Sequence, residues 1–367
     1  MFDRRLVQYF YWGLLGTVFL AGSLGLIVLY SAVRAGPFSH NEILFSKQLI
    51  WFGAGLVVMV ASFMFNYKKL DRWSYLIYCG CIVLLICVFI FGKQFGGSRR
   101  WLTIGQISIQ PSEFVKIGII ICIARYYSKR INSKGLTLRQ LFIPLILTAI
   151  PFVLILKQPD LGTAMLIVLI VGSMTVFAKI ERHSFIYILI SGVVVTPLVW
   201  FFLRGYQKQR LLTFLSPDRD PLGAGYHIIQ SKIAIGSGMM FGKGFLKGTQ
   251  NALSFLPEQH TDFIFSVLAE EWGFIGSIII FLVFLMLIAC SLNVAYGCRD
   301  PFGIMISVGI TIMISWQVFI NIGMVMGLMP IVGVTLPLVS YGGSSIITMM
   351  VSIGILMNIG MRRFMFE

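Results

Sequence analysis

Residues 271–295 read EWGFIGSIIIFLVFLMLIACSLNVA, a segment in which Glu271 is the only charged residue. The hydrocarbon core of a bilayer is about 30 Å thick, and a helix needs about 20 consecutive apolar residues to cross it. The segment is long enough, so it predicts a transmembrane helix. The rest of the chain is similar: 57% of its 367 residues are hydrophobic, 12% are charged and the mean hydropathy is +0.89. Soluble domains carry charge on about a quarter of their residues, so the composition indicates an integral membrane protein.

The same criterion predicts ten membrane-spanning segments. They are residues 11–33, 46–66, 74–92, 111–128, 141–157, 160–178, 185–203, 271–295, 304–328 and 341–361. Because these segments use almost the whole length, we expect an all-α polytopic membrane fold with a single membrane domain, residues 1–367. The first segment follows Arg4 and Arg5, as in a signal peptide, but its apolar run is longer than the about 7–15 residues of a signal core. We therefore expect it to be retained as a helix.

The basic residues between the segments predict the orientation of the chain. Cytoplasmic connections carry an excess of lysine and arginine. If both termini are cytoplasmic, fifteen basic residues lie at inner ends of the segments and seven at the short outer ends. The polar stretch 204–270, between the seventh and eighth segments, then forms a large extracytoplasmic loop. The net charge of +15 is scattered over short connections, so we expect no nucleic-acid partner.

Several kinds of site find no support in the sequence. The six cysteines lie in apolar segments or in a short connection, without disulfide or metal-binding spacing. No G-x-S-x-G or H-E-x-x-H motif and no Walker loop is present. We therefore expect neither a nucleophilic triad nor ATP as the energy source, and the 14 acidic residues become the main candidates for chemistry.

Two acidic positions have ordinary structural explanations. Glu113 and Lys116 are three residues apart at the start of segment 111–128, close enough on one helical face to form an ion pair. Such a structural pair is favoured over direct catalysis by Glu113. Asp160 follows Pro159 in a pattern typical of a residue that caps free backbone N–H groups. For Asp160, capping and substrate contact both stay open.

Asp262 is different because it lies at the seam between the polar loop and the membrane. The loop ends in LPEQHTDF at residues 256–263, and an apolar run follows directly. Desolvation by this run would raise the pKa of the Asp262 carboxyl and make it a better base near neutrality, whereas a nearby cation would oppose this. Capping of the helix that begins there is the alternative.

The outer segments also offer cations beside glycine-rich backbone. They are Arg99, Arg100, Arg204, Lys208, Arg210, Lys232, Lys243 and Lys247. Such side chains suit an anionic head group such as a diphosphate, but general attraction to anionic lipid explains them as well. Within the same loop, the isoleucines of residues 227–235 predict a short amphipathic helix on the membrane surface.

Five motifs in order along the chain resemble those of the SEDS family of bacterial cell-wall polymerases. They are GSRRWL at 97–102, QPSE at 110–113 with Lys116, QPDLGT at 158–163, LPE at 256–258 with HTDF at 260–263, and PLVSYGGSS at 337–345. The resemblance extends from the first apolar segment to the last. The lack of a long N-terminal extension and the residues at 248–250 are more similar to elongation members than to division members.

The resemblance implies a peptidoglycan glycosyltransferase that polymerises lipid II into β-1,4 glycan strands on the outer face of the bacterial cytoplasmic membrane, for elongation and rod shape. It implies that Asp262 is the catalytic carboxylate and that Glu113 and Lys116 form a supporting ion pair. Further candidates for contacts with the substrate or its diphosphate are Arg99, Arg100, Asp160, Arg210, Lys243, Lys247 and His260. No cofactor and no protein metal site are expected, with a divalent cation (Mg²⁺ or Mn²⁺) as an optional assistant.

The resemblance also implies partners: a class B penicillin-binding protein with transpeptidase activity, and the elongation machinery. Three other readings stay open. A lipid II flippase or transporter also has many spans with embedded charges. A scaffold would only hold a partner enzyme through its helices, and a division-type polymerase would perform the same chemistry elsewhere in the cell.

Overall fold

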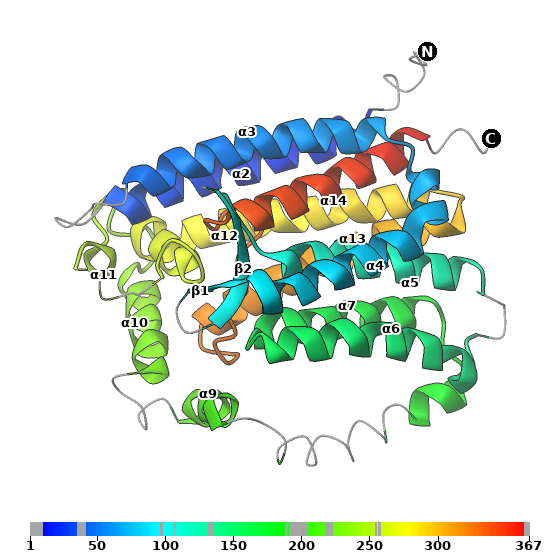
Figure 1. Cartoon of the computed structure of the whole chain (residues 1–367). Helices are drawn as coiled ribbons and strands as arrows, with labels where there is room; N and C mark the ends of the chain where they lie inside the picture. Colours follow the sequence, from blue (N-terminus) through cyan, green and yellow to red (C-terminus); the bar gives the residue numbers. More distant parts are fainter. Residues whose placement is uncertain are drawn as a thin grey trace.

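The computed structural model of the chain is a bundle of long helices with one small sheet at one end (Figure 1). It describes residues 10–34, 42–95, 98–105, 107–130, 135–187, 190, 201, 205–216, 223–253, 255 and 258–362. The helices of the bundle are α2 (Trp12–Arg34), α3 (Glu42–Met64), α4 (Tyr67–Phe91), α5 (Pro111–Ser128), α6 (Leu138–Lys157), α7 (Leu161–Phe177), α12 (Ile264–Gly297), α13 (Pro301–Val325) and α14 (Gly343–Arg362). Between α7 and α12 lie the shorter helices α9 (Gly205–Leu215), α10 (Ala224–Ser237) and α11 (Thr249–Ala252).

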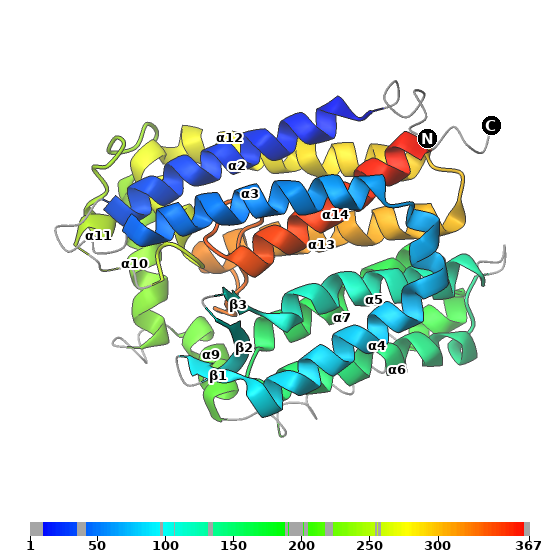
Figure 2. The ribbon, with the colours of Figure 1, turned by 45° about the horizontal axis from the view of Figure 1, so that its top comes forward.

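The long helices form two packed groups that α13 joins (Figure 2). In one group α14 packs along α3 and α2 packs along α12, and in the other α4 packs on α5 and α6 on α7. Helix α13 contacts α12 on one side and α5 and α7 on the other. Most residues of α5, α13 and α14 are buried, whereas α3, α4 and α6 expose many large apolar side chains. An apolar core with an apolar outer surface is expected where the surrounding solvent is lipid.

Seven described helices are long and apolar enough to cross a membrane: α2, α3, α4, α6, α12, α13 and α14. The predicted segments 111–128 and 160–178 are also helical, as α5 with 18 residues and α7 with 17. The predicted segment 185–203 lies largely outside the described residues. The all-α polytopic membrane fold is confirmed, with nine of the ten predicted segments present as helices in the part of the chain that is described.

The two ends of the bundle differ. Helix α2 begins and α14 ends at one end, and α9, α10 and α11 lie at the other (Figure 1). The predicted short helix at 227–235 is present within α10, which runs crosswise to the long helices at that end. The large loop therefore caps the end of the bundle that is opposite to the beginning of α2 and the end of α14.

A small antiparallel sheet adds to this loop-bearing end and was not predicted. Its strands β1 (Lys93–Phe95), β2 (Ser98–Ile104) and β3 (Ile107–Ile109) are ordered β1-β2-β3. Leu102 pairs with Ile109, and Gly105 turns the chain with a φ of 63°, a conformation that glycine adopts readily. The sheet places Arg100 beside the start of α7, where it donates to the carbonyls of Gln158 and Pro159.

Helix α12 is interrupted near its start, and the large loop fills the interruption. Gly273 has φ 66° and ψ −158°, a region open essentially to glycine alone. The N–H of Phe274 donates a hydrogen bond of 2.8 Å to the carbonyl of Met239 in the loop, in place of a helical partner. A Cβ atom on Gly273 would lie 2.3 Å from the backbone N of Gly242. The break therefore anchors the loop backbone on α12.

Candidate active site

Asp262 lies in turns that lead directly into α12. The N–H groups of Thr261 and Phe263 donate to the carbonyl of Glu258, at 3.1 and 3.5 Å. The cap position of α12 is Phe263, which has no side-chain cap. The Asp262 side chain is half-buried, and its carboxylate makes no hydrogen bond to any residue that the structure describes. Asp262 is therefore not the helix cap that the sequence left as an alternative.

The segment before α14 holds these turns in place. The Oγ of Ser340 donates a hydrogen bond of 2.6 Å to the carbonyl of Thr261, and the N–H of Tyr341 donates one of 2.9 Å to the carbonyl of His260. Both residues belong to the motif at 337–345, to which the sequence assigned no role. The backbone around Asp262 is thus held while its carboxylate stays available.

Burial and charge together set the ionisation of Asp262. Burial, and after it the carboxylates of Glu258 and Asp160, raise the pKa of its carboxyl from 3.8 to about 6. The guanidinium groups of Arg100 and Arg210 oppose the rise. The carboxylate is therefore largely ionised at neutral pH and still basic enough to take a proton, which is the balance that suits a general base.

The two arginines reach this carboxylate from different parts of the fold. On β2, Arg100 donates from Nε to the carbonyl of Gln158 at 3.1 Å and from Nη2 to the carbonyl of Pro159. Successive side chains of a strand point to opposite faces, and the neighbouring Arg99 is exposed. Arg210 comes from α9 and is half-buried. Of the two predicted cations on β2, the structure brings Arg100 to the site and leaves Arg99 outside it.

Asp160 is a buried cap of α7. Its Oδ1 accepts a hydrogen bond of 3.2 Å from the N–H of Thr163, and its Oδ2 accepts from the Thr163 hydroxyl at 3.0 Å and from Gln110 Nε2 at 3.1 Å. The geometry supports capping over substrate contact, since neighbouring protein groups already use both oxygens. Asp160 acts on Asp262 through its charge.

Glu113 and Lys116 form an ion pair at the start of α5. Lys116 Nζ lies 2.8 and 2.7 Å from the two carboxylate oxygens of Glu113, and the side chains are only 2% and 10% exposed for Lys116 and Glu113. A buried charge needs its partner, because removing one partner leaves the other uncompensated. Gln110, which contacts Asp160, is the residue directly before α5. The pair therefore stabilises the helix start that supports the Asp160 cap.

Lys243 has a different partner from the one predicted. Its Nζ lies 2.7 Å from Glu270 Oε1 and 2.7 Å from Thr249 Oγ1. The Glu270 side chain is fully buried in α12 and requires a counter-charge. Lys243 is therefore paired with Glu270, and its role as a diphosphate ligand stays a prediction. Lys247 is exposed, and neither lysine is among the charges that shift the pKa of Asp262.

His260 lies beside the turns as a partly buried ring. Its Nε2 is 3.9 Å from Glu258 Oε2, and its ring centroid is 5.8 Å from that of Tyr341. Burial lowers the pKa of His260 below 6.5, and the Glu258 carboxylate opposes this only in part. The imidazole is therefore neutral at pH 7, so it offers the substrate a hydrogen bond and no positive charge.

Sequence reasoning missed Asn321 of α13. Its Nδ2 donates a hydrogen bond of 3.0 Å to the backbone carbonyl of Asp262. A signal was present, because an amide inside the apolar segment 304–328 is costly in lipid and points to a structural or functional role. That signal identifies no partner, since the partner is 59 residues away in the sequence.

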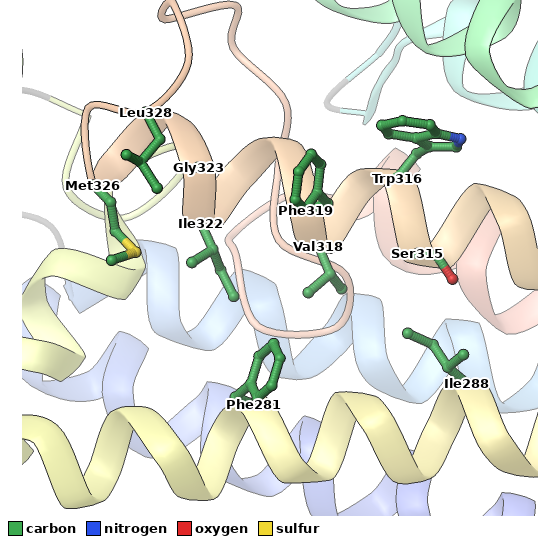
Figure 3. A pocket seen from close by; sticks show the side chains of 10 residues that line it. All are labelled: Phe281, Ile288, Ser315, Trp316, Val318, Phe319, Ile322, Gly323, Met326 and Leu328. Carbon is green, nitrogen blue, oxygen red and sulfur yellow. The ribbon is translucent and has the colours of Figure 1, made fainter.

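An apolar groove lies between α12 and α13. Its lining differs from the charged residues around Asp262. The groove has a volume of about 570 Å³. Figure 3 shows side chains of both helices around it, with Phe281 and Ile288 on α12 and Trp316 and Phe319 on α13. Ser315 is the one hydroxyl in its lining, and no lining residue is charged. The groove suits hydrocarbon and not a sugar or a diphosphate.

No group of three or more His, Cys, Asp or Glu side chains that could hold a metal ion occurs among the described residues. The participation of a divalent cation stays a prediction.

Comparison with known proteins places this arrangement in a family. A model of the FtsW, RodA and SpoVE proteins, described as "Cell cycle protein", matches residues 11–364. The chain belongs to the FtsW/RodA/SpoVE family. Membership confirms the resemblance that the five SEDS motifs indicate.

Named members of the FtsW/RodA/SpoVE family are similar over nearly their whole length. The peptidoglycan glycosyltransferase MrdB of Escherichia coli K12 is 42% identical over 344 residues, which is 92% of each chain. The peptidoglycan glycosyltransferase RodA of Treponema pallidum is 33% identical and covers 98% of this chain and 99% of its own. A solved chain from a peptidoglycan synthase complex that coordinates polymerization and crosslinking has a TM-score of 0.82, with 29% identity over 97% of this chain and 98% of that one.

Proposed function

We propose that this protein is a peptidoglycan glycosyltransferase that polymerises lipid II into β-1,4 glycan strands for cell elongation. The observation that carries the proposal is the Asp262 carboxylate, which has a raised pKa, makes no hydrogen bond to a described residue and faces the charges of Arg100 and Arg210. It lies at the start of a membrane-spanning helix. Names of relatives such as MrdB and RodA support the same activity.

In the proposed reaction, Asp262 acts as a general base. Its carboxylate takes the proton from the 4-hydroxyl of an incoming lipid II sugar, and the oxygen forms a bond to the anomeric carbon of the lipid-linked growing strand. The bond from that carbon to the diphosphate breaks, and undecaprenyl diphosphate leaves with the electron pair. Attack from the face opposite the leaving group inverts an α-linked donor to a β-1,4 product.

One carboxylate is enough because of the leaving group. Glycosidases need a second carboxyl group as an acid, since an alkoxide leaves poorly. A diphosphate leaves as a stabilised anion, and cations can stabilise the charge that develops on it. Arg100 and Arg210 are the best candidates among the residues predicted from the sequence, because both act on Asp262 electrostatically. A divalent cation bound through the diphosphate would add to this effect.

The setting of the reaction follows from the orientation of the chain. The short connections carry most of their basic residues at the end opposite to the large loop, so the loop and Asp262 lie on the extracytoplasmic face of the bacterial inner membrane. The glycan strand made there needs crosslinking. We propose a class B penicillin-binding protein as the partner, in line with the similar chain solved within a complex that couples polymerization to crosslinking.

The test is a polymerisation assay with purified protein and lipid II in detergent, with and without the penicillin-binding partner, in which glycan length is measured on a gel. Wild-type protein should make polymer, and Asp262→Asn should make about 10²–10⁴-fold less, the usual contribution of a general base. Asp300→Asn is the matched control: Asp300 caps α13 at the opposite end of the bundle, and asparagine caps equally well.

Each outcome separates the rival functions. Polymer from Asp262→Asn at the wild-type rate would contradict the base assignment. No polymer from wild-type protein, even with its partner, would contradict the enzyme and favour a scaffold. Transport of lipid II across a vesicle membrane that survives Asp262→Asn, with no polymer from either protein, would indicate a flippase.

A further inference from the structure

Asn321 lies near the end of α13, where it joins the two segments that form the site. Its side chain is fully buried, and its Nδ2 donates to the carbonyls of Asp262 at 3.0 Å and of Val334 at 2.7 Å. Its Oδ1 has no hydrogen-bond partner among the described residues. Both partners are carbonyl oxygens, so only the NH₂ group of the amide satisfies them. One buried side chain therefore links the backbone of Asp262 to the loop that faces it.

That loop, residues 332–334, forms the wall beside the carboxylate. Gly333 has a φ of 74°, and a Cβ atom on it would lie 3.4 Å from Asp262 Oδ2. On the other side, the carbonyl of Val332 packs so closely against the first turn of α7 that a Cβ atom on Gly162 would lie 2.3 Å from it. The loop is thus placed between Asp262 and the start of α7, with no space to move toward α7.

We infer that Asn321 is a positioning residue that holds the Asp262 carboxylate at its working distance from this wall and from Arg100 at the start of α7. The inference rests on the proposed function of Asp262. Without the amide, two buried carbonyls lose their donors, and their segments would shift to reach water or another donor. A displacement of about 1 Å in a reacting group can cost about a hundredfold in rate.

The chain contains a matched control for this residue. Asn358 of α14 is also fully buried and bridges backbone groups, because its Nδ2 donates to the carbonyl of Phe63 and its Oδ1 accepts from the N–H of Tyr67 at 3.0 Å. These contacts join α14 to the end of α3 and the start of α4, far along the bundle from Asp262. Substitution of either asparagine removes a buried amide that bonds to the backbone of two segments, but only Asn321 contacts the site.

The experiment compares Asn321→Ala and Asn321→Asp with Asn358→Ala and Asn358→Asp in the lipid II assay, with thermal unfolding measured for each. Asn321 variants should lose about ten- to a hundredfold in kcat, with KM for lipid II within about threefold of wild type. In Asn321→Ala the acid limb of the pH profile should also move to lower pH, because water entering the vacated space solvates the carboxylate. Asn358 variants should unfold earlier but keep the wild-type kcat and acid limb.

Wild-type kcat and an unshifted acid limb in folded Asn321→Ala would overturn the inference, as would equal kcat losses in the two series at equal loss of stability. If Asn321→Ala is not recovered folded, Asn321→Ser replaces it. Serine keeps one donor, so a kcat between those of wild type and the alanine variant is expected. Activity of Asp262→Asn would instead contradict the proposed function itself, so the two failures are distinguishable.

Discussion

Burial makes ionisation of the Asp262 carboxyl costly, and the charges of Arg100 and Arg210 reduce this cost. Burial raises its pKa to about 6, while Arg100 and Arg210 keep it from rising further. Lys243 shows a different case: its charge neutralises the buried Glu270 and is not among the charges that shift the pKa of Asp262. The value of each charged residue to the reaction depends on which partner the fold brings to it.

This balance predicts the pH dependence of polymerisation. The base works only as a carboxylate, so kcat/KM should fall as the pH drops through about 6, with an apparent pKa near that of Asp262. Arg210→Gln removes a charge that lowers this pKa, so its acid limb should lie at higher pH, whatever the loss in maximal rate. Both effects can be measured from rates of glycan formation across roughly pH 5–9, a range that includes the pKa of about 6.

Lys247→Gln is the control for the loss of one positive charge. Lys247 is exposed in the same loop and is not among the charges that shift the pKa of Asp262. The acid limb of the pH profile of Lys247→Gln should coincide with that of wild type. An acid limb that stays in place in Arg210→Gln would show that this arginine does not act on the base.

Among the helices, α12 carries both the site and the anchor of the large loop. Asp262 lies just before its first turn, and Gly273 interrupts it about three turns later, where loop backbone replaces helical hydrogen bonds. A straight helix would leave the loop without this attachment. The break therefore connects the position of the loop to the position of Asp262.

Gly273→Ala should destabilise the protein and lower activity. The new Cβ atom would meet the backbone N of Gly242 at 2.3 Å, and the φ of 66° with ψ of −158° costs an alanine on the order of 1–3 kcal/mol. We expect a lower thermal midpoint and faster proteolysis within residues 238–250. Both can be measured on protein in detergent.

Gly53→Ala in α3 is the matched control for this substitution. No atom lies within 4 Å of the position that its Cβ atom would occupy. Alanine is favoured over glycine inside a helix by about 1 kcal/mol, so this variant should be as stable as wild type or more so. Equal stability of the two variants would mean that the interruption of α12 does not anchor the loop.

The molecule as a whole has one end that carries its site. The beginning of α2 and the end of α14 lie together at the other end (Figure 1). The excess of basic residues at that end predicts that it is cytoplasmic. In the proposed orientation, the site has access to substrates from outside the membrane.

Fusions to reporter proteins test this orientation. Green fluorescent protein after the C-terminus should fluoresce, and alkaline phosphatase inserted after Lys247 should be active, because each reporter works on one side of the membrane only. Alkaline phosphatase fused after Arg130, in a predicted cytoplasmic connection, is the control and should be inactive. The reverse pattern would place Asp262 in the cytoplasm.

Much of the fold and part of the site could be predicted from local sequence. Apolar length predicts the spans, because each helix satisfies its own backbone in lipid without help from its neighbours. The pairing of Glu113 with Lys116 and the cap at Asp160 depend on residues three apart, and the structure contains both contacts. The seam between loop and membrane identified Asp262 for a similar reason, since its apolar flank is adjacent in sequence.

What sequence alone could not determine depends on residues far apart in the chain. Arg100 reaches the site and Lys243 does not, because β2 packs at the start of α7 whereas the loop that carries Lys243 is attached at Glu270. Asn321 meets Asp262 only where α13 returns beside α12. A membrane-spanning segment is set by its own apolar length, but a site is set by distances between segments, and only their packing decides those distances.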